Sequence, residues 1–217
     1  LGRSRGLGDV YKRQAGAGLD PARGPVLAVI PRIPPDGDVS WLDPLCTALK
    51  DVAFRTGASI LLVPFDPEKG GDARACRDIA ARLLPSLPVA ILDGWHAAED
   101  VAACLGLCAL TVATRLHGLY LSVLSGTPVV ALDYDPKVRA AAREFGGDVP
   151  VLSLAGLDAR ALESTLATAL EGAPGPRPRL IAAPVSYTHL RAHQPGLELV
   201  CRLLLAKKKQ HTHHHHL

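Results

Sequence analysis

Short apolar runs alternate with longer stretches of helical periodicity between residues 25 and 171. The short runs are rich in Val, Ile, Leu and Ala, which indicates buried strands, and apolar residues every three or four positions indicate helices. Strands are predicted at residues 25–31, 58–65, 89–93, 109–114, 128–133 and 149–153. Helices are predicted at residues 41–56, 72–84, 97–105, 116–124, 136–145 and 158–170.

Residues typical of helix ends mark several of these boundaries. Ser40 is expected to cap the first helix and Gly57 to close it. Gly126 is expected to end the fourth helix. Asp135 is expected to cap the fifth, with Pro136 in its first position.

Strands this apolar are buried on both faces, which is typical of a parallel sheet. Right-handed crossovers then favour an α/β fold with a doubly wound, mostly parallel six-stranded sheet in the order 3-2-1-4-5-6. In that order the chain reverses between the first and fourth strands. A ligand is therefore expected at the carboxyl ends of those two strands.

The two ends of the chain do not continue the pattern of the body. Residues 1–14 and 184–217 are expected to be foreign or disordered and resemble translated sequencing-adapter sequence, with residues 172–183 as a linker to the tail. The chain contains no Met, which agrees with a fragment. No apolar run reaches the roughly 18 residues of a membrane span.

Setting the ends aside reverses the charge. They hold 9 of the 24 Lys and Arg and 2 of the 21 Asp and Glu, so residues 15–183 carry 15 basic and 19 acidic side chains, a net charge of −4. Binding of nucleic acid therefore has no support. Seven of the nine His also lie in the tail, so no metal site is predicted. His96 remains, interpreted as a loop residue, together with His117.

Four cysteines lie within predicted helices. They are interpreted as small buried residues of a protein in the reducing cytoplasm, because no other soft metal ligand lies close to them in the sequence. These residues are Cys46, Cys76, Cys104 and Cys108.

The strongest candidate site is Arg115-Leu116-His117, between the fourth strand and the fourth helix. A helix N-terminus offers unpaired N–H groups, and an arginine fork matches a carboxylate or phosphate, so an anion site is predicted. His117 could donate a proton or bind the anion. The alternatives are a salt bridge from Arg115 to an acidic neighbour such as Asp133 and a packed helix-face role for His117.

Weaker candidates surround this site. Arg32 follows the first strand and is either a second anion ligand or a solvated loop residue. Lys137 and Arg139 oppose the dipole of the fifth helix, which favours a nearby anion as much as a solvated face. Asp133 and Asp135 could hold a metal or act as a base, although turn and cap roles are simpler.

Residues 112–118 (VATRLHG) and 126–139 (GTPVVALDYDPKVR) resemble the paired motifs of bacterial polysaccharide pyruvyl transferases. The resemblance covers roughly residues 25–146. It implies one Rossmann-like lobe of a two-lobed, GT-B-like enzyme, whose N-terminal lobe is missing here. It also implies transfer of the enolpyruvyl group of phosphoenolpyruvate to a carbohydrate, forming a pyruvate ketal of a cell-wall polysaccharide.

The resemblance assigns roles to individual residues. His117 is expected to be catalytic, and the donor is expected to be bound by Arg115, Leu116, Arg32 and Lys137. No cofactor is implied besides the donor substrate, and the carbohydrate acceptor can be lipid-linked. Two other functions stay open: a lobe of a GT-B glycosyltransferase or sugar-nucleotide epimerase, and a non-catalytic α/β ligand-binding domain.

Overall fold

The computed structural model describes residues 19, 24–66, 71–92, 97–145 and 149–172. The chain divides into two compact units, Leu1–Pro178 and Arg179–Leu217, and every described residue belongs to the first. The ends predicted to be foreign, and all of the predicted linker except Gly172, lie outside the described residues.

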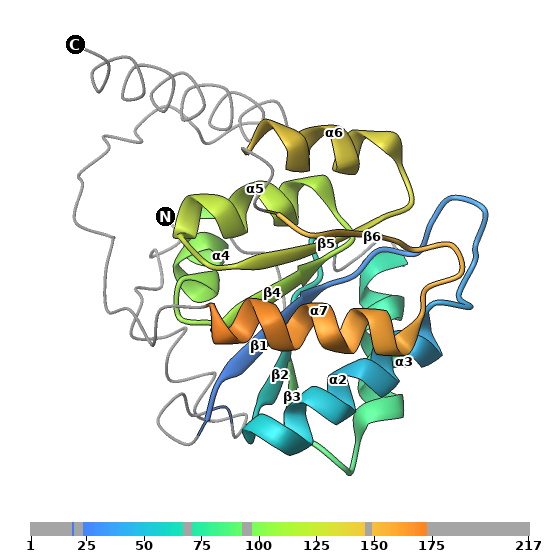
Figure 1. Cartoon of the computed structure of the whole chain (residues 1–217), viewed down its shortest axis with the longest axis vertical. Helices are drawn as coiled ribbons and strands as arrows, with labels where there is room; N and C mark the ends of the chain where they lie inside the picture. The colour runs from blue at the N-terminus through green and yellow to red at the C-terminus, as the bar shows by residue number, and fades with distance from the viewer. Residues whose placement is uncertain (1–18, 20–23, 67–70, 93–96, 146–148, 173–217) are drawn as a thin grey trace, which may run out of the picture. The chain divides into compact units, whose positions relative to one another are not determined.

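Six strands form one parallel sheet in the order β3-β2-β1-β4-β5-β6 (Figure 1). This is the predicted order, and the predicted fold class, α/β with a doubly wound sheet, is confirmed. The chain adds strands toward one edge of the sheet up to β3 and toward the other edge from β4, so the order reverses between β1 and β4, as expected. The strands are β1 (Val26–Ile30), β2 (Ser59–Leu62), β3 (Val89–Ile91), β4 (Leu110–Ala113), β5 (Val129–Asp133) and β6 (Val151–Ser153).

Helices cover both faces of the sheet (Figure 1). α2 packs beside α3 and α7 on one face, and α5 packs beside α4 and α6 on the other. No helix within the described residues has the length and apolar character needed to cross a membrane. The helices are α2 (Leu42–Thr56), α3 (Gly71–Leu83), α4 (Ala98–Leu105), α5 (Leu116–Ser125), α6 (Pro136–Glu144) and α7 (Ala159–Glu171).

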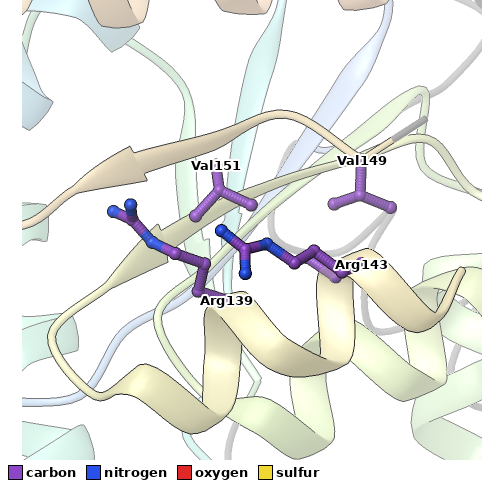
Figure 2. A pocket seen from close by; sticks show the side chains of 5 residues that line it. Arg139, Arg143, Val149 and Val151 are labelled. Atoms are coloured by element: carbon purple, nitrogen blue, oxygen red, sulfur yellow. The ribbon is translucent and has the colours of Figure 1, made fainter. Parts of the chain in front are cut away.

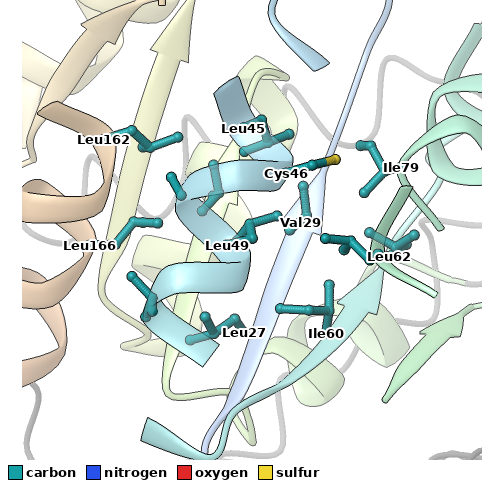
Figure 3. Packing of buried hydrophobic residues seen from close by; sticks show 14 of the residues in the cluster. Leu27, Val29, Leu45, Cys46, Leu49, Ile60, Leu62, Ile79, Leu162 and Leu166 are labelled. Atoms are coloured by element: carbon teal, nitrogen blue, oxygen red, sulfur yellow. The ribbon is translucent and has the colours of Figure 1, made fainter. Parts of the chain in front are cut away.

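The main apolar core lies between the sheet and the helices on the α2 side of it (Figure 3). Leu45 and Leu49 of α2 are fully buried against strand residues such as Leu27 and Ile60. Full burial of a Leu contributes about 1.5–3 kcal/mol relative to its exposure. The core therefore holds β1 and its neighbours rigidly, and with them the loops at their carboxyl ends.

One predicted strand is shorter than expected, and amides that follow it bind a side chain. Pairing of β2 ends at Leu62, although residues 58–65 are all compatible with a strand. The amides of Phe65 and Asp66 donate instead to Oδ2 of Asp72, each at 3.2 Å. The exit of β2 is therefore fixed to the first turn of α3.

The expected cap of the first helix is wrong. The helix begins at Leu42, its N-cap position is Trp41, and no side chain caps it. Asp38 accepts both the amide and the hydroxyl of Ser40, at 2.9 and 3.0 Å. The Ser40 hydroxyl is thus donated away from the helix.

The other helix-end signals are confirmed. Asp135 caps α6 by accepting the amide of Lys137 at 2.9 Å, with Pro136 in the first position. Gly57 and Gly126 end α2 and α5 with φ of 70° and 74°, in the left-handed region that favours glycine.

Candidate functional site

The carboxyl ends of β1 and β4 are joined directly. Thr114 is fully buried, and its amide donates to the carbonyl of Ile30 at 3.1 Å. Its hydroxyl points to the same carbonyl at 3.4 Å. The loops that follow Ile30 and Thr114 therefore begin side by side. This is the position where the sequence predicts a ligand.

Gly118 in the first turn of α5 packs against β1. A Cβ at this position would lie 2.9 Å from two carbon atoms of the Ile30 side chain. Gly118 therefore has a packing role against β1. The helix N-terminus lies directly over the end of β1 as a result.

Arg115 follows β4 and occupies the N-cap position of α5, with 15% of its side chain exposed. It forms an ion pair with the buried Asp72. Nη2 donates to Oδ1 at 2.8 Å, and Nε lies 2.6 Å from Oδ2. The geometry at Nε is too poor for a hydrogen bond, so this buried N–H has no hydrogen-bond partner among the described residues.

The alternative of a salt bridge from Arg115 to an acidic neighbour is therefore observed, but with Asp72 and not with Asp133. Asp133 pairs instead with Arg139, whose Nε lies 2.5 Å from Oδ2. The hydrogen bond to Asp133 is the main cause that raises the pKa of the Arg139 guanidinium. Asp135 is occupied as the cap of α6. Asp135 thus takes the cap role named as the simpler alternative, whereas Asp133 is held in an ion pair.

The charges of two arginines of the predicted site act on Tyr134, directly after β5. Burial raises the pKa of the Tyr134 phenol, and the charges of Arg32 and Arg115 act in the opposite direction. The phenol therefore lies within electrostatic range of both guanidiniums. Arg32 is partly buried and forms no ion pair within the described part of the chain.

Leu116 and His117 form the first turn of α5, and both are half-buried. No side chain of the described residues caps this turn. Its amides and the positive end of the helix dipole can thus face an anion. His117 also makes a contact of its own within the protein. The structure therefore brings Arg32, Arg115 and the Leu116-His117 turn to one edge of the sheet.

Lys137 lies at the start of α6 with its side chain exposed. It is not among the charges that act on Tyr134, unlike Arg32 and Arg115. The backbone of Lys137 thus lies near the end of β5, but its ammonium does not belong to the group of charges that act on Tyr134. His96 lies outside the described residues.

A separate pocket of about 240 Å³ lies between α6 and β6 (Figure 2). Arg139 and Arg143 extend from the helix over Val149 and Val151. Of the candidate residues, Arg139 alone lines this pocket. The chemistry at the ends of β1 and β4 is therefore distinct from it.

The four cysteines of the described residues are buried, and none of them forms a disulfide within this part of the chain. Burial raises the pKa of the Cys46 thiol to about 11 and that of Cys76 to about 12. These thiols are therefore poor nucleophiles and agree with the predicted packing role. Among the described residues, no group of three His, Cys, Asp or Glu could hold a metal ion.

Two residues of the site escaped the sequence analysis. Asp72 carries no local signal for its role because it precedes its partner Arg115 by 43 positions. Tyr134 did carry a signal, since it follows a strand next to the switch point. The order of the strands brings both residues to the site.

Comparison with known proteins places these observations in a family. The sequence model described as "Polysaccharide pyruvyl transferase" matches residues 8–136. The match spans Arg32, Asp72, Arg115 and Tyr134 and ends one residue before Lys137. It starts within the segment 1–14 that was expected to be foreign, and this expectation stays a prediction.

The structure is similar to the crystal structure of an alpha,alpha-trehalose-phosphate synthase (UDP-forming) from Burkholderia xenovorans in complex with glucose-6-phosphate. The TM-score is 0.52 at 14% sequence identity, and the match covers 80% of this chain. It covers 41% of the synthase chain, so this chain spans less than half of that length. The likeness supports the expected fold, one lobe of a GT-B-like enzyme.

Proposed function

The chain belongs to the polysaccharide pyruvyl transferase family, and we propose that it binds phosphoenolpyruvate as the donor of an enolpyruvyl group. The supporting observation is that Arg32 and Arg115 both lie within electrostatic range of the Tyr134 phenol. Two guanidiniums from the ends of different strands suit a ligand with two anionic groups. Phosphoenolpyruvate carries a carboxylate and a phosphate.

The N-terminus of α5 supplies the second part of the donor site. The amides of Leu116 and His117 would bind one anionic group, and Arg115 would bind the same group from the side. Arg32 would bind the other anionic group. Lys137 would approach from the start of α6, where its ammonium is exposed.

The proposed reaction adds two acceptor hydroxyls to one carbon. His117 protonates the methylene carbon of the donor as general acid, and one sugar hydroxyl adds to the neighbouring carbon. The bond from that carbon to the phosphate oxygen then breaks, and the second hydroxyl adds in its place. Of the two protons lost by the hydroxyls, one replaces that given by His117 and one leaves with phosphate. The products are a pyruvate ketal and inorganic phosphate.

The acceptor is proposed to be a cell-envelope sugar, which can be lipid-linked, held by a second lobe opposite this one. A lobe of a glycosyltransferase or sugar-nucleotide epimerase is the competing function, since the fold likeness fits it equally. That function requires a nucleoside diphosphate in the same crevice.

Calorimetric titration of the chain with phosphoenolpyruvate tests the proposal. We expect saturable binding, weakened by roughly tenfold or more in Arg115→Gln because charged hydrogen bonds contribute about 1.5–3 kcal/mol. Arg143→Gln is the matched control, since Arg143 lies in the separate pocket. Binding of uridine diphosphate without binding of phosphoenolpyruvate would overturn the proposal.

A further inference from the structure

Asp72 is held in one orientation by contacts from two different segments. It is 1% exposed. Its Oδ2 accepts the amides of Phe65 and Asp66 at 3.2 Å, and its Oδ1 accepts Nη2 of Arg115 at 2.8 Å. The carboxylate therefore cannot turn without breaking backbone hydrogen bonds of the loop after β2.

The ion pair uses only one side of the Arg115 guanidinium. Asp72 lies along the edge formed by Nε and Nη2. The two N–H groups of Nη1 and the outer N–H of Nη2 form the other edge. An arginine presents its donors in a fixed planar fork, so fixing one edge sets the direction of the other.

Burial makes it costly for the Arg115 guanidinium to keep this orientation without Asp72. Arg115 is 15% exposed, and its Nε already has no hydrogen-bond partner among the described residues. Without the carboxylate, the buried positive charge would have to turn toward solvent or remain unpaired. The guanidinium would then lose the carboxylate that fixes its orientation.

We propose that Asp72 is a positioning residue that aims the free edge of the Arg115 guanidinium at the donor anion. This inference rests on the proposed function. It extends the site to the first turn of α3. It also makes donor affinity depend on the conformation of the loop between β2 and α3.

A double-mutant cycle tests the inference. Phosphoenolpyruvate is titrated into the full chain and into Asp72→Asn, Arg115→Gln and the double variant, at a temperature where thermal denaturation shows all four folded. Asp72→Asn keeps the size and one acceptor oxygen. We expect it to weaken binding by roughly tenfold to a hundredfold, and to have no further effect in the Arg115→Gln background.

Asp78→Asn is the matched control, because Asp78 lies on the same helix in a surface ion pair with Arg74. It should leave affinity unchanged. A second readout does not need the donor: the Nη2–H proton of Arg115 that Asp72 accepts should exchange slowly with solvent in nuclear magnetic resonance spectra and rapidly in Asp72→Asn.

The outcomes separate the two proposals. If the unmodified chain fails to bind phosphoenolpyruvate, the proposed function is wrong and the positioning role for that donor is wrong with it. If the chain binds but Asp72→Asn binds equally or more tightly, only the positioning role is wrong. The same holds if Asp72→Asn weakens binding equally in both backgrounds, or if proton exchange at Arg115 stays slow.

Discussion

Gly118 and Ile30 are in such close contact that a Cβ on the glycine would lie 2.9 Å from Cδ1 and Cγ2 of the isoleucine. Real side chains do not approach this closely, so α5 packs on β1 without space for a methyl group. The contact sets the height of the α5 N-terminus above the sheet. That height in turn sets where Arg115 and His117 lie.

Gly118→Ala should therefore destabilise the fold by about 1–3 kcal/mol, the usual cost of overpacking. Chemical denaturation measures the change. Ile30→Ala in the Gly118→Ala background should recover part of the loss because it removes the atoms in conflict. Gly71→Ala is the control, since a Cβ there meets nothing within 4 Å. Equal effects of the two glycine substitutions would contradict the packing explanation.

The buried thiols predict a loss of stability at alkaline pH. Burial raises the pKa of Cys46 to about 11 and that of Cys76 to about 12, from an ordinary value of 9.0. Above pH 9 the unfolded chain loses thiol protons that the folded chain keeps, so the free energy of unfolding falls as pH rises. Each thiol should contribute a slope of about 1.4 kcal/mol per pH unit.

Denaturation curves at pH 8 and pH 10, values chosen on either side of about 9, measure this slope. Cys76→Ala should reduce the pH dependence of the free energy of unfolding. Any change in stability at pH 8 that the lost packing causes should be the same at pH 10. An unchanged slope in the Cys46→Ala, Cys76→Ala double variant would show that other groups cause the loss.

The Tyr134 phenol should report the charges of the site. Arg32 and Arg115 lower its pKa, while burial has the larger, raising effect. Removing one positive charge with Arg32→Gln should therefore raise the pKa further. Nuclear magnetic resonance titration of labelled tyrosine, with Tyr134→Phe to assign the signal, follows the change. Lys137→Gln should have no effect, and an equal shift there would contradict the placement of Arg32.

The chain alone should bind the donor without catalysing pyruvyl transfer. The proposed acceptor is bound by a second lobe, so phosphoenolpyruvate should bind while no phosphate is released when sugar is added. A coupled phosphate assay measures release. Formation of a pyruvylated sugar by this chain alone would show that the second lobe is dispensable.

The amino-acid sequence alone determined the elements that depend on local interactions. Asp135 caps α6 and Gly57 ends α2 because these signals act within one turn of the chain. The strand order also followed from the sequence, since strands buried on both faces and right-handed connections leave few arrangements. The placement of Arg32 and Arg115 at one edge of the sheet could be predicted because the ends of β1 and β4 must meet in that order.

Only the tertiary structure decided what those residues contact. Ser40 had the right residue type for a cap, but Asp38 accepts its hydroxyl. A salt bridge from Arg115 to a neighbour such as Asp133 was an alternative to the anion site, yet Asp72 is its partner, because the first turn of α3 lies at the end of β4. Such pairings join segments far apart in the sequence. They depend on how the strands and helices pack against one another, which a local sequence pattern does not determine.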